Sequence, residues 1–515
     1  MILFLPRFVR CSRDELDRLH RLTAVWGAPA LAVALGLVFS VASDRAWALD
    51  PSDRPGPGTE ENTKTEQSQP SPVVARNATP QTLAESISSS NSMSIPNWLW
   101  LSGQANFIPQ MHPAFHALYS GENSLRPEAE TDPRTRVLTL YTGLRLTSTT
   151  EVLFDIEETG GTGLSKALGY AGNPNIDVVR NPSLTTDPYV ARIMLHQIIP
   201  LSDDNLPVSR SPLSLFTSLP ARRLELRLGK LDTVDFFDVN GVGSDSQHQF
   251  LNWGIVNNGA YDYAADTRGY TFGALIEYYD HDWVLRFGEM LMPRIANGLQ
   301  LDWDPTRSRS ENVEAEYHHN LLPDREGVIR TLFYANHADM GSYHEAIQAF
   351  QSGIDATPDI TLHRHEGTLK YGFGLNLEQE LTEECRAFTR VGWNNGQSES
   401  FAYTEIDRTV AVGADLKGDQ WGREHDKIGL AYVVNGLSQA HRQYLAAGGL
   451  GFVLGDGALN YGTERILEGY YRVHLWRGVA VSPDFQWITN PGYNQDRGPV
   501  YVFGLRLHLE EVLGK

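Results

Sequence analysis

The sequence predicts an all-β protein, a transmembrane antiparallel β-barrel of about 16 strands (18 also fits) with a disordered N-terminal segment. Segments of about 9–11 residues in which apolar and polar residues alternate recur from residue 95 to residue 509. The apolar face of these segments carries Leu, Val or Phe in the middle and aromatic residues toward the ends, as bilayer interfaces favour. The opposite face is rich in charge and glycine, as a water-filled lumen requires.

Composition agrees with this fold class and excludes others. The 515 residues include 43 Lys+Arg against 63 Asp+Glu, a net charge of −20, so a protein that wraps a nucleic-acid backbone is excluded. Mean hydropathy is −0.32, and no segment after residue 50 approaches the roughly 20 apolar residues of a spanning helix. A barrel with a polar lumen accommodates both observations.

The first 94 residues predict an exported protein. An apolar stretch from Leu22 to Val41 follows five arginines and precedes Ala46-Trp47-Ala48, an A-x-A cleavage pattern, so residues 1–48 are interpreted as a signal peptide. An uncleaved N-terminal anchor is the alternative. Residues 49–94 are rich in Ser, Pro, Thr and Glu and predict a disordered linker, and residues 95–515 predict the barrel domain.

The two cysteines fit export without a disulfide. Cys11 lies in the predicted signal peptide, which leaves Cys385 as the single thiol of the mature chain. A disulfide within the mature chain and a cysteine-based metal site are therefore both excluded.

Strands are expected wherever apolar positions alternate with polar ones. From residue 95 to residue 509 there are 415 residues, which accommodate about 16 strands of about 10 residues with their turns and loops. Short helices are expected near 94–120 and 341–352. The clearest alternating segments are residues 138–147, 151–157, 223–229, 371–381, 479–487 and 501–509.

One combined pattern resembles a known family. The segments that carry the resemblance are residues 229–232, 236–238, 249–253 and 259–269, then 468–472, 483–488, 490–492, 496–497 and 503–508. Together they resemble the carbohydrate-selective porins of Gram-negative outer membranes, the OprB-like porins, over about residues 97–509. The resemblance implies a 16-stranded barrel in the outer membrane through which sugars diffuse.

Charged residues that alternate with the apolar face are expected to line the lumen. Arg145, Glu225, Arg227 and Glu277 are the strand residues proposed to contact solute, because carboxylates and guanidinium groups hydrogen-bond to sugar hydroxyls. The alternative is that they solvate the wall and hold strands together. Further residues expected on this face are Asp155, Glu157, Glu378, Glu380, Arg472, Asp484 and Arg506.

Residues 232–268 are the best candidate for a loop inside the pore, because this segment is long and rich in Gly, Asn, Asp and aromatic residues. The alternative is a folded loop with a structural role, held by an ion pair from Arg268 to Asp262 or Asp266. The candidate solute-contacting residues in this segment are Asn252, Trp253, Asp262, Asp266 and Arg268.

No cofactor or metal site is predicted. His318-His319 and His363-x-His365 have ligand-type side chains, but adjacent histidines on a strand face opposite sides, and no further ligand follows in sequence. A Gly-x-Ser-x-Gly elbow is absent from the sequence, so a hydrolase is unsupported.

The function that fits these features best is passive, carbohydrate-favouring diffusion of small hydrophilic solutes across the cell outer membrane. The expected partners are sugars or other small polar solutes, outer-membrane lipid and the barrel assembly machinery, with no nucleic acid. The alternatives are a barrel enzyme acting on lipid or glycan, and a non-selective or structural barrel.

Overall fold

A computed structural model describes residues 96–179 and 184–513, and sixteen of its strands form one closed antiparallel barrel. The predicted signal peptide and linker lie outside the described residues. The barrel strands are β1 (Leu99–Met111), β2 (Arg134–Arg145), β3 (Thr150–Thr162), β4 (Tyr189–Pro200), β7 (Arg222–Leu231), β8 (Thr271–Asp280), β9 (Trp283–Leu291), β10 (Arg309–Leu322), β11 (Arg325–Gly341), β12 (Arg364–Glu380), β13 (Cys385–Asn394), β14 (Arg408–Lys417), β15 (Lys427–Gly436), β16 (Glu464–Trp476), β17 (Val479–Thr489) and β18 (Val500–Leu513).

Strands that are neighbours in sequence are neighbours in the barrel, and β1 closes it by pairing with β18 from Leu101↔Leu513 onward. One departure sets the strand number. Between β4 and β7, the strands β5 (Asn205–Pro207) and β6 (Ser218–Pro220) pair only with each other, so β4 pairs directly with β7. The expected number of 16 is therefore confirmed over the alternative of 18.

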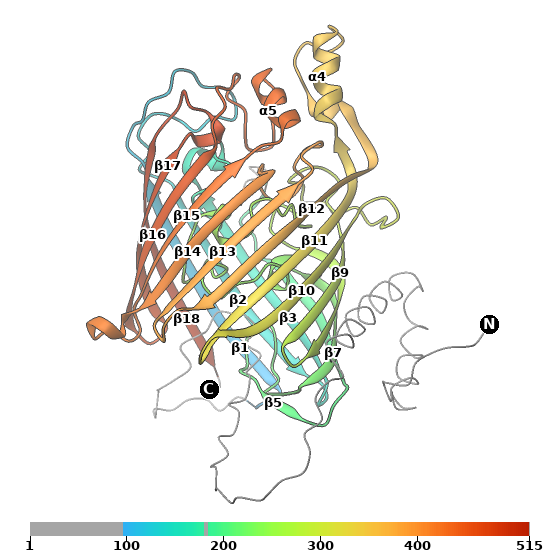
Figure 1. Cartoon of the computed structure of the whole chain (residues 1–515), viewed down its shortest axis with the longest axis vertical. Helices are drawn as coiled ribbons and strands as arrows, with labels where there is room; N and C mark the ends of the chain where they lie inside the picture. Colours follow the sequence, from blue (N-terminus) through green and yellow to red (C-terminus); the bar gives the residue numbers. More distant parts are fainter. Residues whose placement is uncertain (1–95, 180–183, 514–515) are drawn as a thin grey trace, which may run out of the picture.

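The two ends of the barrel differ in their connections (Figure 1). At one end the turns 281–282, 323–324 and 477–478 have two residues each, and we call this the short-turn end. At the other, the long-loop end, connections include 163–188 and 232–270, and α4 (Tyr343–Gln351) and α5 (Gln439–Ala446) lie there. Short turns at one end and long loops at the other are typical of outer-membrane barrels.

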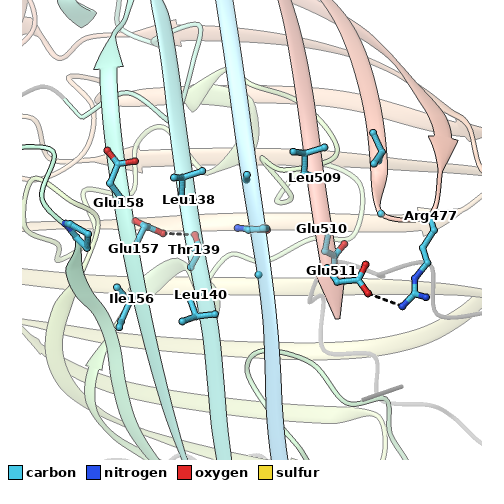
Figure 2. Close-up of a pocket in the computed structure, with 16 residues that line it drawn as sticks. Leu138, Thr139, Leu140, Ile156, Glu157, Glu158, Arg477, Leu509, Glu510 and Glu511 are labelled. Carbon is cyan, nitrogen blue, oxygen red and sulfur yellow. Dashed lines mark hydrogen bonds and ion pairs between the residues drawn. The ribbon is translucent and has the colours of Figure 1, made fainter. Parts of the chain in front are cut away.

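Alternation along each strand separates an apolar outer face from a polar inner face. On β2, Leu138 and Leu140 are exposed outward while Thr139 between them is buried and donates to the Glu157 carboxylate across 3.1 Å. Figure 2 shows this alternation beside a groove of about 590 Å³ on the outer face. Exposed leucines on a folded surface are stable where lipid rather than water surrounds them.

Aromatic side chains form two belts on the outer face, as the sequence predicted. Toward the long-loop end these are Phe272, Trp303, Tyr371, Trp393, Trp487, Tyr501 and Phe503, and toward the short-turn end Trp98, Trp283, Tyr317, Trp421, Tyr471 and Trp476. Amphipathic rings favour the two membrane–water interfaces, so the belts mark the edges of the apolar band.

Helices are few and short. The helix expected near 341–352 is confirmed by α4, whose N-cap Ser342 accepts a hydrogen bond from the Glu345 amide. The helix expected near 94–120 is wrong, because residues 99–111 form β1 and pair with both β2 and β18. Among the described residues, none of the helices is long and apolar enough to cross a membrane.

A buried histidine holds the helices at the long-loop end. His441 on α5 stacks on Tyr343 of α4 with ring centroids 4.4 Å apart, and its Nδ1 lies 3.1 Å from Asp407 and its Nε2 3.6 Å from Glu405. Burial favours neutral imidazole, but the two carboxylates outweigh it and raise the pKa of His441 to about 9.

Docking of α5 is expected to weaken as pH rises. Because the pKa is about 9 in the docked state and about 6.5 in the free state, protonation stabilises docking fully below about pH 6.5. This contribution is lost as the pH rises through about 9. Over that rise the equilibrium constant for docking falls by up to about tenfold per pH unit. Hydrogen-exchange protection of the α5 amides should fall accordingly, and should become nearly pH-independent in His441→Gln. Equal pH dependence in both proteins would contradict this role.

Candidate functional site

A chain of ion pairs runs around the lumen face and joins eight neighbouring strands from β3 to β12. We call it the ion-pair girdle. Its links are Glu151–His196 (2.7 Å), His196–Glu225 (2.8 Å), Glu225–Arg227 (2.7 Å), Arg227–Glu277 (2.8 Å), Glu277–Arg286 (3.2 Å), Arg286–Glu316 (2.8 Å), Glu316–Arg330 (2.8 Å) and Arg330–Glu378 (3.4 Å). Charges of both signs alternate along it, so each carboxylate faces at least one cationic or imidazole partner.

Three of the four strand residues proposed to contact solute meet within this girdle. Glu225 and Glu277 are direct cross-strand partners, and Arg227 lies between their carboxylates and bonds to both. Their exposed fractions are 0%, 2% and 2% in the order Glu225, Arg227, Glu277. Arg227 also donates to the carbonyl oxygen of Leu213, in the connection between β4 and β7. In this arrangement the three side chains join β7 to β8 and are buried from solvent.

Arg145 lies apart from the other candidates. It is the last residue of β2, at the short-turn end, where it faces Glu151 across the β2–β3 ladder. It also borders a groove of about 460 Å³ with Trp98 and Phe216. Arg145 is therefore placed at one mouth of the barrel rather than beside the loop 232–270.

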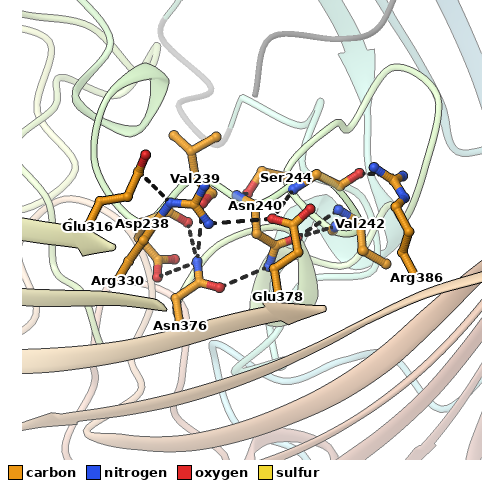
Figure 3. Close-up of polar contacts among 12 residues, drawn as sticks. Asp238, Val239, Asn240, Val242, Ser244, Glu316, Arg330, Asn376, Glu378 and Arg386 are labelled. Carbon is orange, nitrogen blue, oxygen red and sulfur yellow. Dashed lines mark hydrogen bonds and ion pairs between the residues drawn. The ribbon is translucent and has the colours of Figure 1, made fainter. Parts of the chain in front are cut away.

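The loop 232–270 folds into the lumen and is anchored first on β12 and β13. Arg390 of β13 donates to the carbonyl oxygens of Ile255 (2.6 Å) and Asp238 (2.9 Å), and its Nε lies 3.0 Å from the Asp238 carboxylate. Asn376 of β12 donates to the same carboxylate at 3.2 Å. Figure 3 shows Asn376 and Glu378 of β12 beside the turn that contains Asp238 and Asn240.

A second anchor lies on β16 and β17, which β14 and β15 separate from the first. The Glu468 carboxylate of β16 accepts the backbone amides of Leu251 and Asn252, and the Asn252 side chain donates to Gln486 of β17 at 3.0 Å. Asn252 also caps the short helix α3 (Trp253–Val256) by accepting the Gly254 amide. Asn252 is fully buried, so it fixes this part of the loop to the wall.

The two aspartates proposed as solute contacts are also buried, Asp262 against other segments of the barrel domain and Asp266 within the loop itself. Asp262 pairs with Lys370 at 3.0 Å and accepts the backbone amides of Phe401 and Ala402. Asp266 accepts the backbone amides of Arg268 and Tyr270, while burial raises the pKa of its carboxyl. The loop is thus held by Asp262–Lys370 and by a tight turn at Asp266, in place of the ion pairs with Arg268 that the sequence suggested.

Trp253 links the loop to its neighbours through ring contacts. Its indole stacks on Tyr403, with centroids 5.3 Å apart and planes 10° apart, and its Nε1 donates to the Asn175 carbonyl at 2.8 Å. Asn175 belongs to the loop 163–188, which the Glu464 carboxylate holds in the lumen by accepting two of its amides. Two long loops therefore narrow the same lumen from the long-loop end.

A half-buried polar cluster lies where the loop 232–270 returns to β8. The Arg268 guanidinium lies 3.9 Å over the ring of Tyr189, and Tyr189 packs edge-to-face on Tyr270. Both tyrosine hydroxyls donate to Glu157, the Tyr270 bond measuring 3.1 Å. Burial raises the pKa of Tyr270 well above its ordinary value, so its hydroxyl keeps its proton. We call these four residues the tyrosine–arginine cluster.

This cluster offers donors and acceptors without a strong net charge. Among the described residues Arg268 forms no ion pair, so its N–H groups can donate to a solute hydroxyl. Both tyrosine hydroxyls donate their protons in hydrogen bonds to Glu157. Their oxygens keep lone pairs that can accept a hydrogen bond from a solute hydroxyl. Of the candidates predicted from sequence, Arg268 is the one placed in such a setting.

Sequence reasoning missed several residues on which the site depends. Tyr189 begins β4 and Tyr270 directly precedes β8, and neither carries a local signal beyond being aromatic. The anchors Arg390, Lys370 and Glu468 follow the ordinary inward alternation of their strands. A charged inward position is a detectable signal, but its partner in the loop lies more than 100 residues away.

Two of the three comparisons with known proteins found matches. A search of curated proteins found no match. Among solved structures, the high-pH form of Pseudomonas putida OprB matches with a TM-score of 0.61 at 14% identity, covering 81% of this chain and 94% of that one. The low-pH form (TM-score 0.43, 11% identity, 81% and 93% covered) and Pseudomonas aeruginosa OccK2 (OpdF) (0.39, 10%, 82% and 99%) also match.

The likeness to the high-pH form supports the barrel fold. The family model of the carbohydrate-selective porins matches the chain from residue 136 to residue 510. This range includes the ion-pair girdle, the loop 232–270 and its anchors. The chain therefore belongs to the carbohydrate-selective porin, OprB family.

Proposed function

We propose that this outer-membrane diffusion channel favours carbohydrates, and that solutes contact the tyrosine–arginine cluster as they pass the loop 232–270. The observation that carries the proposal is a half-buried guanidinium over the ring of Tyr189, whose hydroxyl donates to Glu157. The hydroxyls of Tyr270 and Thr139 donate to the same carboxylate. A sugar presents many hydroxyls, each of which can donate and accept hydrogen bonds. The cluster offers both donors and acceptors, which can replace the hydrogen bonds that the sugar makes with its hydration water.

Charge balance explains why neutral solutes are favoured. Arg268 and Glu157 both contact Tyr189, one at its ring and the other at its hydroxyl, and the girdle pairs its charges internally. A lone ion entering this environment loses hydration and meets girdle charges that are already paired with one another, whereas a polyol loses little. Passage needs no chemical step, so the proposal assigns no catalytic residue.

The proposed location is the outer membrane, and it follows from the family and from the apolar outer face of the barrel. Lipid of the outer membrane would surround the apolar band between the aromatic belts, after insertion by the barrel assembly machinery. Sugars or other small polar solutes are the proposed cargo.

A liposome-swelling assay on the refolded full chain tests this function. Glucose, a disaccharide and an uncharged amino acid of similar size to glucose are compared. Faster swelling with the sugars than with the size-matched control would support carbohydrate preference. Equal rates would leave a non-selective channel, and no swelling from a folded barrel would favour the structural or enzymatic alternatives.

Replacing Arg268 with Gln is expected to lower sugar flux about three- to tenfold and to leave the size-matched control nearly unchanged. The reason is that a hydrogen bond from a charged donor contributes about 1.5–3 kcal/mol, which a neutral amide supplies only in part. Arg307→Gln is the matched control, because Arg307 pairs with the exposed carboxylates of Asp304 and Glu366. Equal losses for both solutes in Arg268→Gln would contradict a sugar-contacting role.

A further inference from the structure

Two histidines and a glutamate meet between the loop 232–270 and the wall near the short-turn end. His248 comes from the loop, and His508 and Glu510 lie two residues apart on the same face of β18. One ligand atom from each lies within 4.8 Å of the others, and the Nε2 atoms of both histidines are 3.9 Å from Glu510 Oε2. In the described part of the chain, this is the one group of three His, Cys, Asp or Glu side chains whose ligand atoms lie this close together.

Hydrogen bonds on the far side of each ring fix which nitrogen carries the proton. His248 Nδ1 lies 2.9 Å from the Asp245 carboxylate, which can only accept, so Nδ1 is the protonated nitrogen. Asn106 donates its amide to Asp177 and Gln247, which turns its oxygen toward His508 Nδ1 at 2.7 Å. Both imidazoles therefore present an unprotonated Nε2 toward Glu510 when they are neutral.

His508 Nε2 has an unmet bonding capacity. The His508 side chain is 3% exposed, and its Nε2 has no hydrogen-bond partner among the described residues. A buried nitrogen lone pair without a partner carries an energetic penalty. Its position beside a second imidazole nitrogen and a carboxylate oxygen is the arrangement that a metal ion would satisfy.

The loop that carries His248 is already held in place. Arg506 of β18 donates to the carbonyl oxygens of Ser246 (2.6 Å) and Gln249 (2.8 Å), one on each side of His248. The imidazole rings of His248 and His508 lie 4.3 Å apart. A small closure of the three side chains would bring their ligand atoms to common bonding distance from one ion.

We propose that His248, His508 and Glu510 bind a Zn²⁺-class divalent ion. Two imidazoles and one carboxylate suit borderline metals, whereas Ca²⁺ and Mg²⁺ prefer oxygen ligands throughout. Asp245 and Asn106 supply the outer hydrogen bonds that orient metal-binding histidines. The bound ion would join the loop 232–270 to β18, so this site adds a cross-link to a loop that narrows the pore.

Binding of Co²⁺ and Zn²⁺ to the folded, tag-free full chain in detergent tests the site. Co²⁺ serves as the spectroscopic probe, because coordination by imidazole and carboxylate gives visible absorption that Zn²⁺ then removes by competition. We expect one ion per chain. His508→Asn should raise the Kd at least about 100-fold, and Asp245→Asn, which removes an orienting carboxylate, about 10- to 100-fold.

His318→Gln is the matched control. His318 is also a lumen-facing histidine between two carboxylates, Glu316 at 2.7 Å and Glu326 at 2.9 Å, but its two nitrogens are both occupied by them. The His318→Gln variant should bind Co²⁺ and Zn²⁺ as tightly as the wild type. Glu510→Gln provides a second test in which both histidines remain, and heat-modifiable migration on gels confirms that each variant is folded.

Two results would overturn the proposal. One is a folded wild-type barrel that does not bind Co²⁺ or Zn²⁺ at micromolar concentration. The other is binding that survives in both His508→Asn and Glu510→Gln, or that His318→Gln weakens equally. Sugar swelling is measured separately, so a failure here leaves the proposed function to its own test.

Discussion

Replacing Arg390 with Met is expected to release the loop 232–270 from the wall, raise single-channel conductance and reduce sugar selectivity. Arg390 is fully buried, donates to the carbonyl oxygens of Ile255, Val256 and Asp238 and to the Ser244 hydroxyl, and pairs with the Asp238 carboxylate at 3.0 Å. Removing it leaves a buried carboxylate uncompensated, which costs about 3–5 kcal/mol.

The cost can be relieved by moving the loop. Once Asp238 lacks its cation, hydration of its carboxylate favours displacement of the turn from β12 and β13 toward water. The anchor on Glu468 and Gln486 and the Asp262–Lys370 pair remain, so the rest of the loop should stay attached. Planar-bilayer recordings should therefore show larger and noisier currents, and swelling rates for glucose and its size-matched control should converge.

Arg408→Met is the matched control for this variant. Arg408 begins β14 and is the direct cross-strand partner of Trp393, but it is exposed on the outer face. Its loss removes the same charge without touching the loop. Conductance and selectivity of Arg390→Met equal to those of the wild type would show that the loop is held without this arginine.

Replacing Glu225 with Gln is expected to destabilise the barrel by about 3–5 kcal/mol while keeping its shape. The Glu225 carboxylate is fully buried and lies 2.6 Å from Arg223, 2.7 Å from Arg227 and 2.8 Å from His196. A neutral amide leaves two buried guanidinium groups with reduced compensation, and its NH₂ group faces donors. Reversible unfolding of the refolded barrel in urea with lipid vesicles measures the change.

Glu366→Gln controls for the loss of a carboxylate in general. Glu366 pairs with Arg307 at 2.8 Å, but both side chains are about half exposed or more (67% and 49%). Water and salt screen such pairs, so its free energy of unfolding should equal that of the wild type. If Glu225→Gln is as stable as Glu366→Gln, the girdle contributes nothing beyond surface ion pairs.

The sequence by itself determined the barrel and the direction of its side chains. Alternation with a period of two is a local property, because successive side chains of a strand point to opposite faces whatever the strand pairs with. It therefore predicted that Glu225, Arg227 and Glu277 point inward, and the total length predicted about 16 strands. It also located the long inward loop, because glycine- and asparagine-rich stretches interrupt the alternation.

Only the tertiary structure decided what each inward residue does. The ion pair of Asp238 with Arg390 and the meeting of His248 with His508 depend on barrel closure and loop folding, which bring together residues far apart in sequence. The same holds for Arg268 and Tyr189. Residues proposed as solute contacts, such as Asn252 and Asp262, are buried because backbone amides and cations of distant segments satisfy them. Burial and pairing are properties of the packed lumen, and local sequence patterns carry neither.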